Sequence, residues 1–177
     1  MIRSSDNWFC PAGAALDIAG LYRYHLWRTW NTTLPRVLWV MLNPSRADHL
    51  VNDATVRRCL DFSQRWGYGS LEVVNLFAWR STAPDMLLDV HVVDPVGDEN
   101  DAAIMDAAQR AERVVVAWGG HRAALRRVDA VLTLLARAHR PPFCLGRTQD
   151  GQPVHPLRLP KTLEPVPYLA PRWEASP

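Results

Sequence analysis

The stretch Arg36–Asp48, with the sequence RVLWVMLNPSRAD, decides the fold of this chain. It begins with an apolar run from Val37 to Leu42 and turns abruptly polar at Asn43. A run that is apolar on both faces is typical of a central strand in a parallel sheet. In open α/β sheets, ligands bind just beyond the carboxyl ends of such strands. The stretch therefore predicts a buried strand that leads into the first part of a functional site.

Three more apolar runs follow along the chain, and segments of helical character separate them. The further predicted strands are Leu71–Leu76, Val114–Trp118 and Phe143–Leu145. The predicted helices are residues 54–66, with Asp53 as N-cap, residues 99–112, and a long helix from about 121 to 139. Strands that alternate with helices imply parallel pairing, right-handed crossovers and helices on both faces. We therefore predict an α/β fold, a three-layer αβα sandwich with a four-stranded parallel central sheet.

The length of 177 residues predicts one domain, with a core of about residues 21–160. Residues 1–20 and 161–177 are expected to be terminal extensions. Within the core, Leu21–Trp30 alternates apolar with polar side chains, which predicts an edge strand or a short hairpin arm.

Composition excludes several classes of protein. The net charge of +2 permits a nucleic-acid partner without requiring one. Cys10, Cys59 and Cys144 are far apart and lack CxxC spacing, so we expect no disulfide framework, no metal site and no cofactor. No apolar stretch near the N-terminus has the length of a signal or a membrane span, which predicts a cytoplasmic protein without membrane contact.

Polar and glycine-rich segments follow all four predicted strands. A parallel sheet brings the carboxyl ends of its strands to one side, so these segments should converge on one site. They are Asn43–Asp48, Asn75–Thr82, Gly119–His121 and Gly146–His155.

Each candidate residue also has a structural interpretation. Asn43 precedes a proline and is equally well explained as a turn former. Asn75 ends an apolar strand, where its carboxamide matches the O4 and N3–H edge of a pyrimidine or else bridges two loops. A neutral His155 can stabilise an oxyanion, or simply pack or cap. Asp48 and Asp53 are candidate carboxylates for water activation, although Asp53 has its expected capping role.

Several segments resemble, in order and spacing, the bacterial family called domain of unknown function 1643. They are LNPSRAD, DATVRRC, VVNLFAWRST, DPVGDEN, VVAWGGH and LGRTQDGQPVHPLRLP, over roughly Leu21 to Leu159. This resemblance implies no established activity.

A more distant resemblance is to the uracil-DNA glycosylase superfamily, which is also a three-layer sandwich with a four-stranded parallel sheet. Its first motif is similar to Leu42–Pro44, its base-reading Asn motif to Asn75–Arg80, and its final His-Pro-Leu motif to His155–Leu157. The sequence departs from that superfamily where Leu42 and Ser45 replace glycines, where the strongest catalytic position lacks an Asp, and where iron–sulfur cysteines are absent.

The second resemblance implies hydrolysis of the N-glycosidic bond of a modified or damaged pyrimidine in DNA or a nucleotide, as in DNA repair or modification. It assigns catalytic roles to Asn43 and His155, with Asp48 as the candidate carboxylate from the residues themselves. The expected substrate-binding residues are Pro44, Ser45, Asn75, Phe77, Trp79, Arg80, Gly119 and Leu157. Two alternatives stay open, namely a non-catalytic module that binds nucleic acid or a modified base, and an enzyme that acts on free nucleotides or small phosphates.

Overall fold

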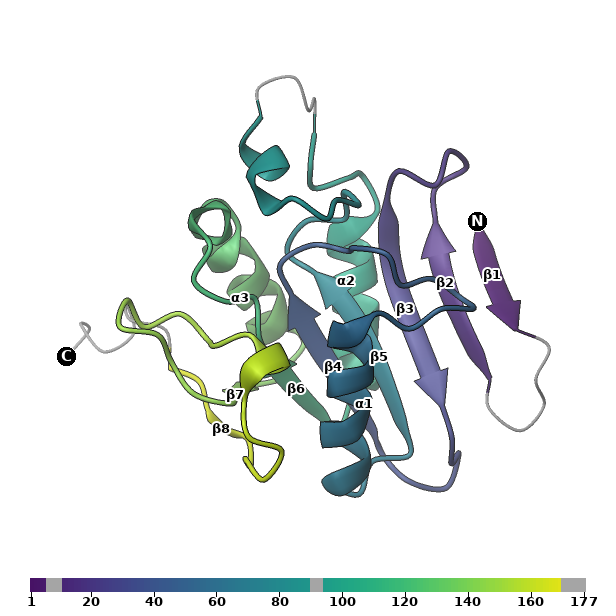
Figure 1. Cartoon of the computed structure of the whole chain (residues 1–177), viewed down its shortest axis with the longest axis vertical. Coiled ribbons are helices and arrows are strands. Elements are labelled where there is room, and N and C mark those ends of the chain that lie inside the picture. Colours follow the sequence, from purple (N-terminus) through teal and green to yellow (C-terminus); the bar gives the residue numbers. More distant parts are fainter. Residues whose placement is uncertain (6–10, 90–93, 170–177) are drawn as a thin grey trace.

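The computed structural model describes residues 1–5, 11–89 and 94–169, and its described strands form one mixed sheet in the order β1-β2-β3-β5-β4-β6-β7-β8 (Figure 1). The strands are β1 (Ile2–Ser5), β2 (Ala12–Leu16), β3 (Arg23–Thr29), β4 (Arg36–Met41), β5 (Ser70–Asn75), β6 (Arg113–Val116), β7 (Pro142–Cys144) and β8 (Val166–Pro167).

The middle of the sheet is parallel. Strand β4 pairs in parallel with β5 on one side and β6 on the other, and β6 pairs in parallel with β7. In this register Trp39 lies beside Val73 on one neighbour and Val115 on the other. These strands coincide with the predicted strands to within one residue, except that β6 ends two residues before Trp118, because strands buried on both faces need mostly apolar sequence.

The prediction of a sheet with only four parallel strands is wrong, because antiparallel strands extend the sheet at both sides. Strands β1, β2 and β3 form an antiparallel meander that joins β5, and β8 pairs antiparallel with β7. Strand β3 is therefore a hairpin arm and not an edge strand. Residues 2–5 and 12–16 belong to the sheet, so the sheet reaches beyond the predicted core of residues 21–160. The sequence of β2, AGAAL, has too little apolar bulk to predict a strand.

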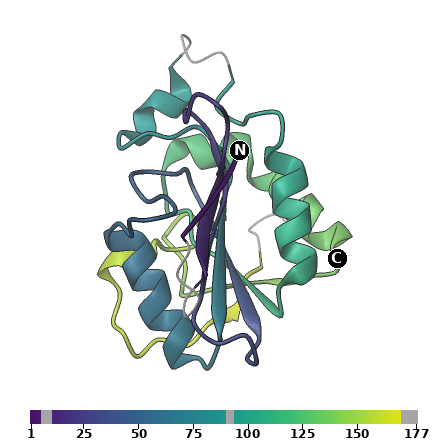
Figure 2. The same cartoon turned by 90° about the vertical axis from the view of Figure 1, so that its right-hand side faces the viewer.

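Helices cover both faces of the sheet. Helix α1 (Ala54–Arg65) lies on one face, and α2 (Asn100–Arg110) and α3 (Val128–Arg137) lie on the other (Figure 2). Asp53 caps α1 as predicted, because its carboxylate accepts a hydrogen bond from the backbone N–H of Val56 at 2.9 Å. The predicted long helix after Gly120 is instead a short 3₁₀ helix, η2 (Arg122–Arg126), followed by α3. Two further 3₁₀ helices are η1 (Pro84–Leu88) and η3 (Pro156–Arg158).

The sheet separates two apolar cores, and β4 contributes to both. Trp39 packs toward α1, where its ring stacks on that of Trp66 at 5.5 Å and its Nε1 donates to Ser63 at 3.0 Å. Leu38 and Val40 belong to the core on the α2 and α3 face. Burial of each such side chain contributes about 1.5–3 kcal/mol.

A buried ionic cluster lies on β5, away from its carboxyl end. The carboxylate of Glu72 is 4% exposed and contacts three basic side chains, Arg36 at 2.6 Å, His25 at 2.9 Å and Arg110 at 3.1 Å. Burial alone raises the pKa of Glu72, but His25 and Arg110 outweigh this effect and hold the pKa below its usual 4.5.

No helix in the described ranges has both the length and the apolar character needed to span a membrane. Cys59 and Cys144 are buried free thiols, and Cys10 lies outside the described residues.

Candidate functional site

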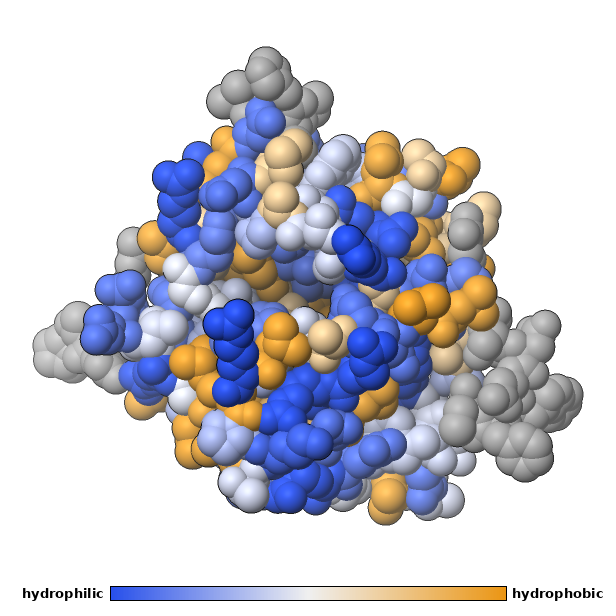
Figure 3. Space-filling model, in the orientation of Figure 1, coloured by the Kyte–Doolittle hydropathy of each residue, from blue (hydrophilic) through white to orange (hydrophobic). Residues whose placement is uncertain are grey.

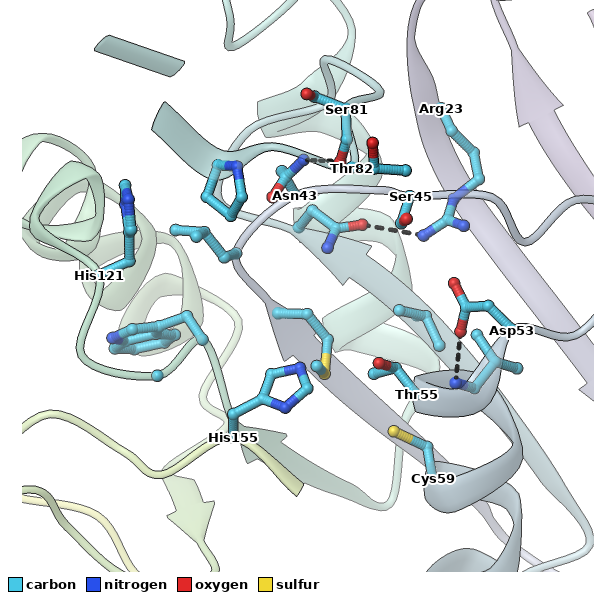
Figure 4. A pocket seen from close by; sticks show the side chains of 18 of the residues that line it. Arg23, Asn43, Ser45, Asp53, Thr55, Cys59, Ser81, Thr82, His121 and His155 are labelled. Atoms are coloured by element: carbon cyan, nitrogen blue, oxygen red, sulfur yellow. Dashed lines mark hydrogen bonds between the residues drawn. The ribbon is translucent and has the colours of Figure 1, made fainter. Parts of the chain in front are cut away.

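A cavity of about 310 Å³ opens at the carboxyl ends of β4, β5 and β6. The cavity forms a hollow near the centre of the face that Figure 3 shows, and Figure 4 shows it from close by. Its polar lining comes from the four predicted segments, from β3 and from the start of α1. The polar side chains are Arg23, Asn43, Ser45, Asp53, Thr55, Asn75, Ser81, Thr82, His121 and His155.

The structure brings five of the predicted site residues together in this cavity and places the other six elsewhere. Those in the lining are Asn43, Ser45, Asn75, Gly119 and His155. Those outside it are Pro44, Asp48, Phe77, Trp79, Arg80 and Leu157.

Asn43 links two of the loops that form the cavity wall. Its Nδ2 donates to the carbonyl of Ser81 at 2.9 Å and to that of Pro44 at 3.1 Å (Figure 4). Both amide protons therefore have partners in the loops. The carboxamide oxygen of Asn43 is the atom left for a water molecule or a ligand, and it acts only as an acceptor.

Asn75 is the last residue of β5 and is 1% exposed. Its Oδ1 accepts a hydrogen bond from Nη2 of Arg23 at 3.1 Å. Its backbone carbonyl accepts from the side chain of Asn100, also at 3.1 Å, so the residue is held from both ends.

His155 precedes η3 and caps it, with Nδ1 accepting a hydrogen bond from the backbone N–H of Leu157 at 3.4 Å. In the neutral ring, an acceptor at Nδ1 places the proton on Nε2. The imidazole is exposed toward the cavity (Figure 4), yet the surrounding protein displaces enough water to lower its pKa from the ordinary 6.5, against the opposing charge of Asp53. His155 thus presents a neutral N–H donor to the cavity.

Asp53, and not Asp48, is the carboxylate of the cavity. Asp53 is the only acidic side chain in the lining formed by the described residues. One of its oxygens caps α1, which leaves the other oxygen as an acceptor. Asp48 instead accepts hydrogen bonds from the backbone N–H groups of Leu50 and Val51 at 2.8 and 2.9 Å, and so stabilises its own turn. The choice of Asp48 as the catalytic carboxylate finds no support in this geometry.

The aromatic and basic residues predicted after β5 have structural positions. Phe77 is 2% exposed in the core, and the ring of Trp79 packs edge-on against Tyr22 at 5.2 Å. Arg80 donates to the carbonyl of Gly20 at 3.0 Å. These contacts reach the β2–β3 hairpin, which the sequence did not predict as a neighbour of this segment.

Pro44 and Leu157 also lie outside the cavity. Pro44 is buried, and its carbonyl accepts from Asn43 and from the backbone of Ser81. Leu157 is 42% exposed and lies beside the outer surface of α1.

Trp118, the last residue of the predicted strand Val114–Trp118, is the aromatic residue that lines the cavity. Its Nε1 donates to Gln152 at 2.9 Å, which fixes the orientation of the indole. Gly119 follows with a φ of 78°, and its N–H donates to the carbonyl of Pro153 at 2.9 Å. This N–H is therefore not available to cradle a phosphate.

His121 stands at the rim. Its Nδ1 caps η2 through Ala123, and its Nε2 lies 3.3 Å from the exposed carboxylate of Asp85 on η1. This contact joins the two 3₁₀ helices beside the cavity. The described residues contain no cluster of three or more His, Cys, Asp or Glu side chains arranged to hold a metal ion.

Comparison with known proteins identifies the family of this chain. None of the curated proteins compared with the chain matches it. A family model described as "Protein of unknown function (DUF1643)" matches residues 23–157, from the first residue of β3 to η3. The matched range thus includes every polar residue of the cavity lining. Because the match extends over well more than half of its length, the chain belongs to the DUF1643 family of proteins of unknown function.

Proposed function

We propose that this protein hydrolyses the N-glycosidic bond of a nucleobase carried by a nucleotide or a nucleic acid. The observation that carries the proposal is the convergence of Asn43, Asn75 and His155 on one cavity from three distant parts of the chain. These are the residues that the uracil-DNA glycosylase resemblance singles out, and they lie at or beyond the carboxyl ends of the parallel strands β4, β5 and β7. A volume of about 310 Å³ is at the small end of ligand pockets and suits a single flat heterocycle.

The proposed reaction is a substitution by water at C1′ of the sugar. The C1′–N bond breaks and its electron pair leaves with the base, while an oxygen of water forms the new bond to C1′. Asp53 accepts the proton of that water, and its negative charge favours the positive charge that develops on the sugar. The carboxamide oxygen of Asn43 accepts a hydrogen bond from the second O–H of the water and so orients it.

The departing base carries the negative charge in this step. The neutral His155 donates its Nε2–H to an oxygen of the base and stabilises the anion until solvent protonates it. A neutral donor suits this role, and the burial that lowers the pKa of His155 keeps the ring neutral near pH 7. Trp118 supplies an aromatic surface in the cavity wall.

The test is release of free base, measured by chromatography. Substrates are nucleosides, nucleotides, and single- and double-stranded oligonucleotides that contain uracil, mispaired thymine or oxidised pyrimidines. Asp53→Asn is the informative variant, because asparagine caps a helix as well as aspartate does but cannot take the proton. We expect this variant to lose base release by at least about 100-fold while it unfolds at nearly the same temperature.

Asp48→Asn is the matched control, since it removes the same charge from the same loop and retains the turn. It should release base at close to the wild-type rate. Base release that Asp53→Asn leaves unchanged would refute the carboxylate role. Retained binding of these substrates by the wild-type protein without any release would replace the enzyme with a base-binding module.

A further inference from the structure

Arg23 is a buried cation at the wall of the cavity, and it comes from β3 and not from a loop. It is 3% exposed, and Nη1 donates to the carbonyl of Ala47 at 2.9 Å while Nη2 donates to Asn75 at 3.1 Å. Burial lowers the pKa of Arg23 to about 10, which leaves it protonated at neutral pH. Its Nε is buried and has no hydrogen-bond partner in the described part of the chain, which costs stability.

The contact with Arg23 decides which way the carboxamide of Asn75 faces. A guanidinium has five donors and no acceptor, so only the oxygen of Asn75 can meet it favourably. The NH₂ group of Asn75 then lies on the side of the carboxamide away from Arg23. A flipped carboxamide would direct N–H at N–H in a buried site, which is strongly unfavourable.

We propose that Arg23 is a positioning residue that sets ligand specificity, because it holds Asn75 as a hydrogen-bond donor toward the cavity. The preferred ligand then carries a carbonyl oxygen at the atom that meets Asn75. A base of the same shape with an amino group at that atom directs its N–H groups at the N–H groups of Asn75 and is therefore rejected. The class of ligand rests on the proposed function, but the preference for oxo over amino groups follows from the donors alone.

The other groups of the cavity agree with this polarity. His155 presents a second fixed donor through Nε2. The fixed acceptors, Asp53 and the oxygen of Asn43, belong to the β4–α1 segment. A heterocycle with carbonyl oxygens toward Asn75 and His155 therefore finds donors at both, while the sugar side faces the acceptors.

The experiment measures binding and not hydrolysis, so that it separates this proposal from the proposed function. Calorimetry gives the affinities of two matched pairs, uridine against cytidine and inosine against adenosine, with Asp53→Asn as background to prevent turnover. We expect the oxo member of at least one pair to bind about tenfold or more tightly, the usual penalty for an unsatisfied buried donor.

Two substitutions at position 23 isolate the cause. Arg23→Lys and Arg23→Gln both lose the planar guanidinium, but lysine still only donates, whereas glutamine both donates and accepts. The lysine variant should keep the oxo preference. The glutamine variant should lose most of it, because Asn75 can then present either end.

The proposal would be overturned if the protein that retains Arg23 bound uridine and cytidine equally well and also bound inosine and adenosine equally well. This holds whatever the variants at position 23 do. Equal selectivity of the lysine and glutamine variants would overturn it too. Failure of every ligand to bind at millimolar concentration would overturn it together with the proposed function, whereas selective binding without any base release would leave it standing alone. If the glutamine variant does not fold, the proposal is still tested by the ratio of oxo-ligand to amino-ligand affinity, measured in the protein with Arg23 and in the lysine variant.

Discussion

Replacing Glu72 by glutamine should destabilise the fold strongly, although Glu72 does not line the cavity. Glutamine has the shape of glutamate but removes the single negative charge among Arg36, His25 and Arg110. The variant therefore leaves the two arginines in contact with a neutral group.

The size of the effect follows from burial. Breaking a fully buried ion pair costs about 3–5 kcal/mol. Here the carboxylate is 4% exposed, but the side chains of His25, Arg36 and Arg110 are 15%, 35% and 45% exposed, so water screens the cations that remain. We therefore expect a loss of about 2–3 kcal/mol in the free energy of unfolding. For a chain of this length that equals about 5–10 °C in Tm, or a urea midpoint lower by about 1 M.

Urea unfolding followed by tryptophan fluorescence measures this difference, and its pH dependence identifies the charge as the cause. The pKa of Glu72 is lowered in the folded protein, so its stabilisation is complete above the ordinary value of 4.5 and disappears as the pH falls through the lower folded value. The gap between wild type and Glu72→Gln should thus be full at pH 7 and shrink in strongly acidic buffer, where both side chains are neutral.

Two results would refute this reasoning. The first is a variant that unfolds at the wild-type urea concentration at pH 7. The second is a gap that stays constant down to acidic pH, since loss of shape or packing does not depend on protonation.

Three more outcomes follow from the surroundings or backbone conformation of single residues. Asp53→Asn should lower the pKa of His155 further, because Asp53 opposes the effect of burial; an NMR titration of the imidazole checks this, and Asp48→Asn should leave the titration unchanged. Gly69→Ala should cost about 1–3 kcal/mol, because the new Cβ would lie 1.9 Å from the carbonyl oxygen of Asn31. Gly67→Ala meets nothing within 4 Å but sits at a φ of 80°, so denaturation curves should show a smaller loss of about 1 kcal/mol.

The parallel strands β4, β5 and β6 could be predicted from the sequence because each of them is buried on both faces. In β4, Leu38 and Val40 face one core while Val37 and Trp39 face the other, which requires an unbroken apolar run. Once the parallel direction was inferred, the convergence of the polar segments at one edge followed from geometry. The convergence of Asn43, Asn75 and His155 on one cavity could therefore be predicted from the sequence.

Contacts between distant parts of the chain could not be predicted from the burial and direction of the strands. Arg23 pairs with a residue 52 positions away, and an arginine in an alternating strand normally indicates a solvent-facing position. Trp79 was expected at the site because it follows β5, but its backbone pairs with Tyr22 of the N-terminal segment. The sequence contained no sign of that pairing.

Asp48 was predicted as the catalytic carboxylate, but Asp53 is the carboxylate that lines the cavity. This difference between prediction and structure has another cause. Both residues lie in the loop between β4 and α1, and both accept backbone hydrogen bonds. A tight turn at Asp48 directs its carboxylate into the loop, whereas the start of α1 carries Asp53 to the cavity wall. Local sequence indicates a cap in one case and a turn in the other, but not which of them faces a ligand.

The origin of Arg23 in β3 has a consequence for the modularity of this fold. In parallel α/β domains the chemistry usually resides in loops, so strands at the margin of the sheet can be lost or exchanged without harm to the site. Here a strand that runs antiparallel to its neighbour β5 supplies part of the cavity wall. A minimal domain cut down to the parallel strands and their loops would keep a scaffold but lose the side chain that holds the carboxamide of Asn75.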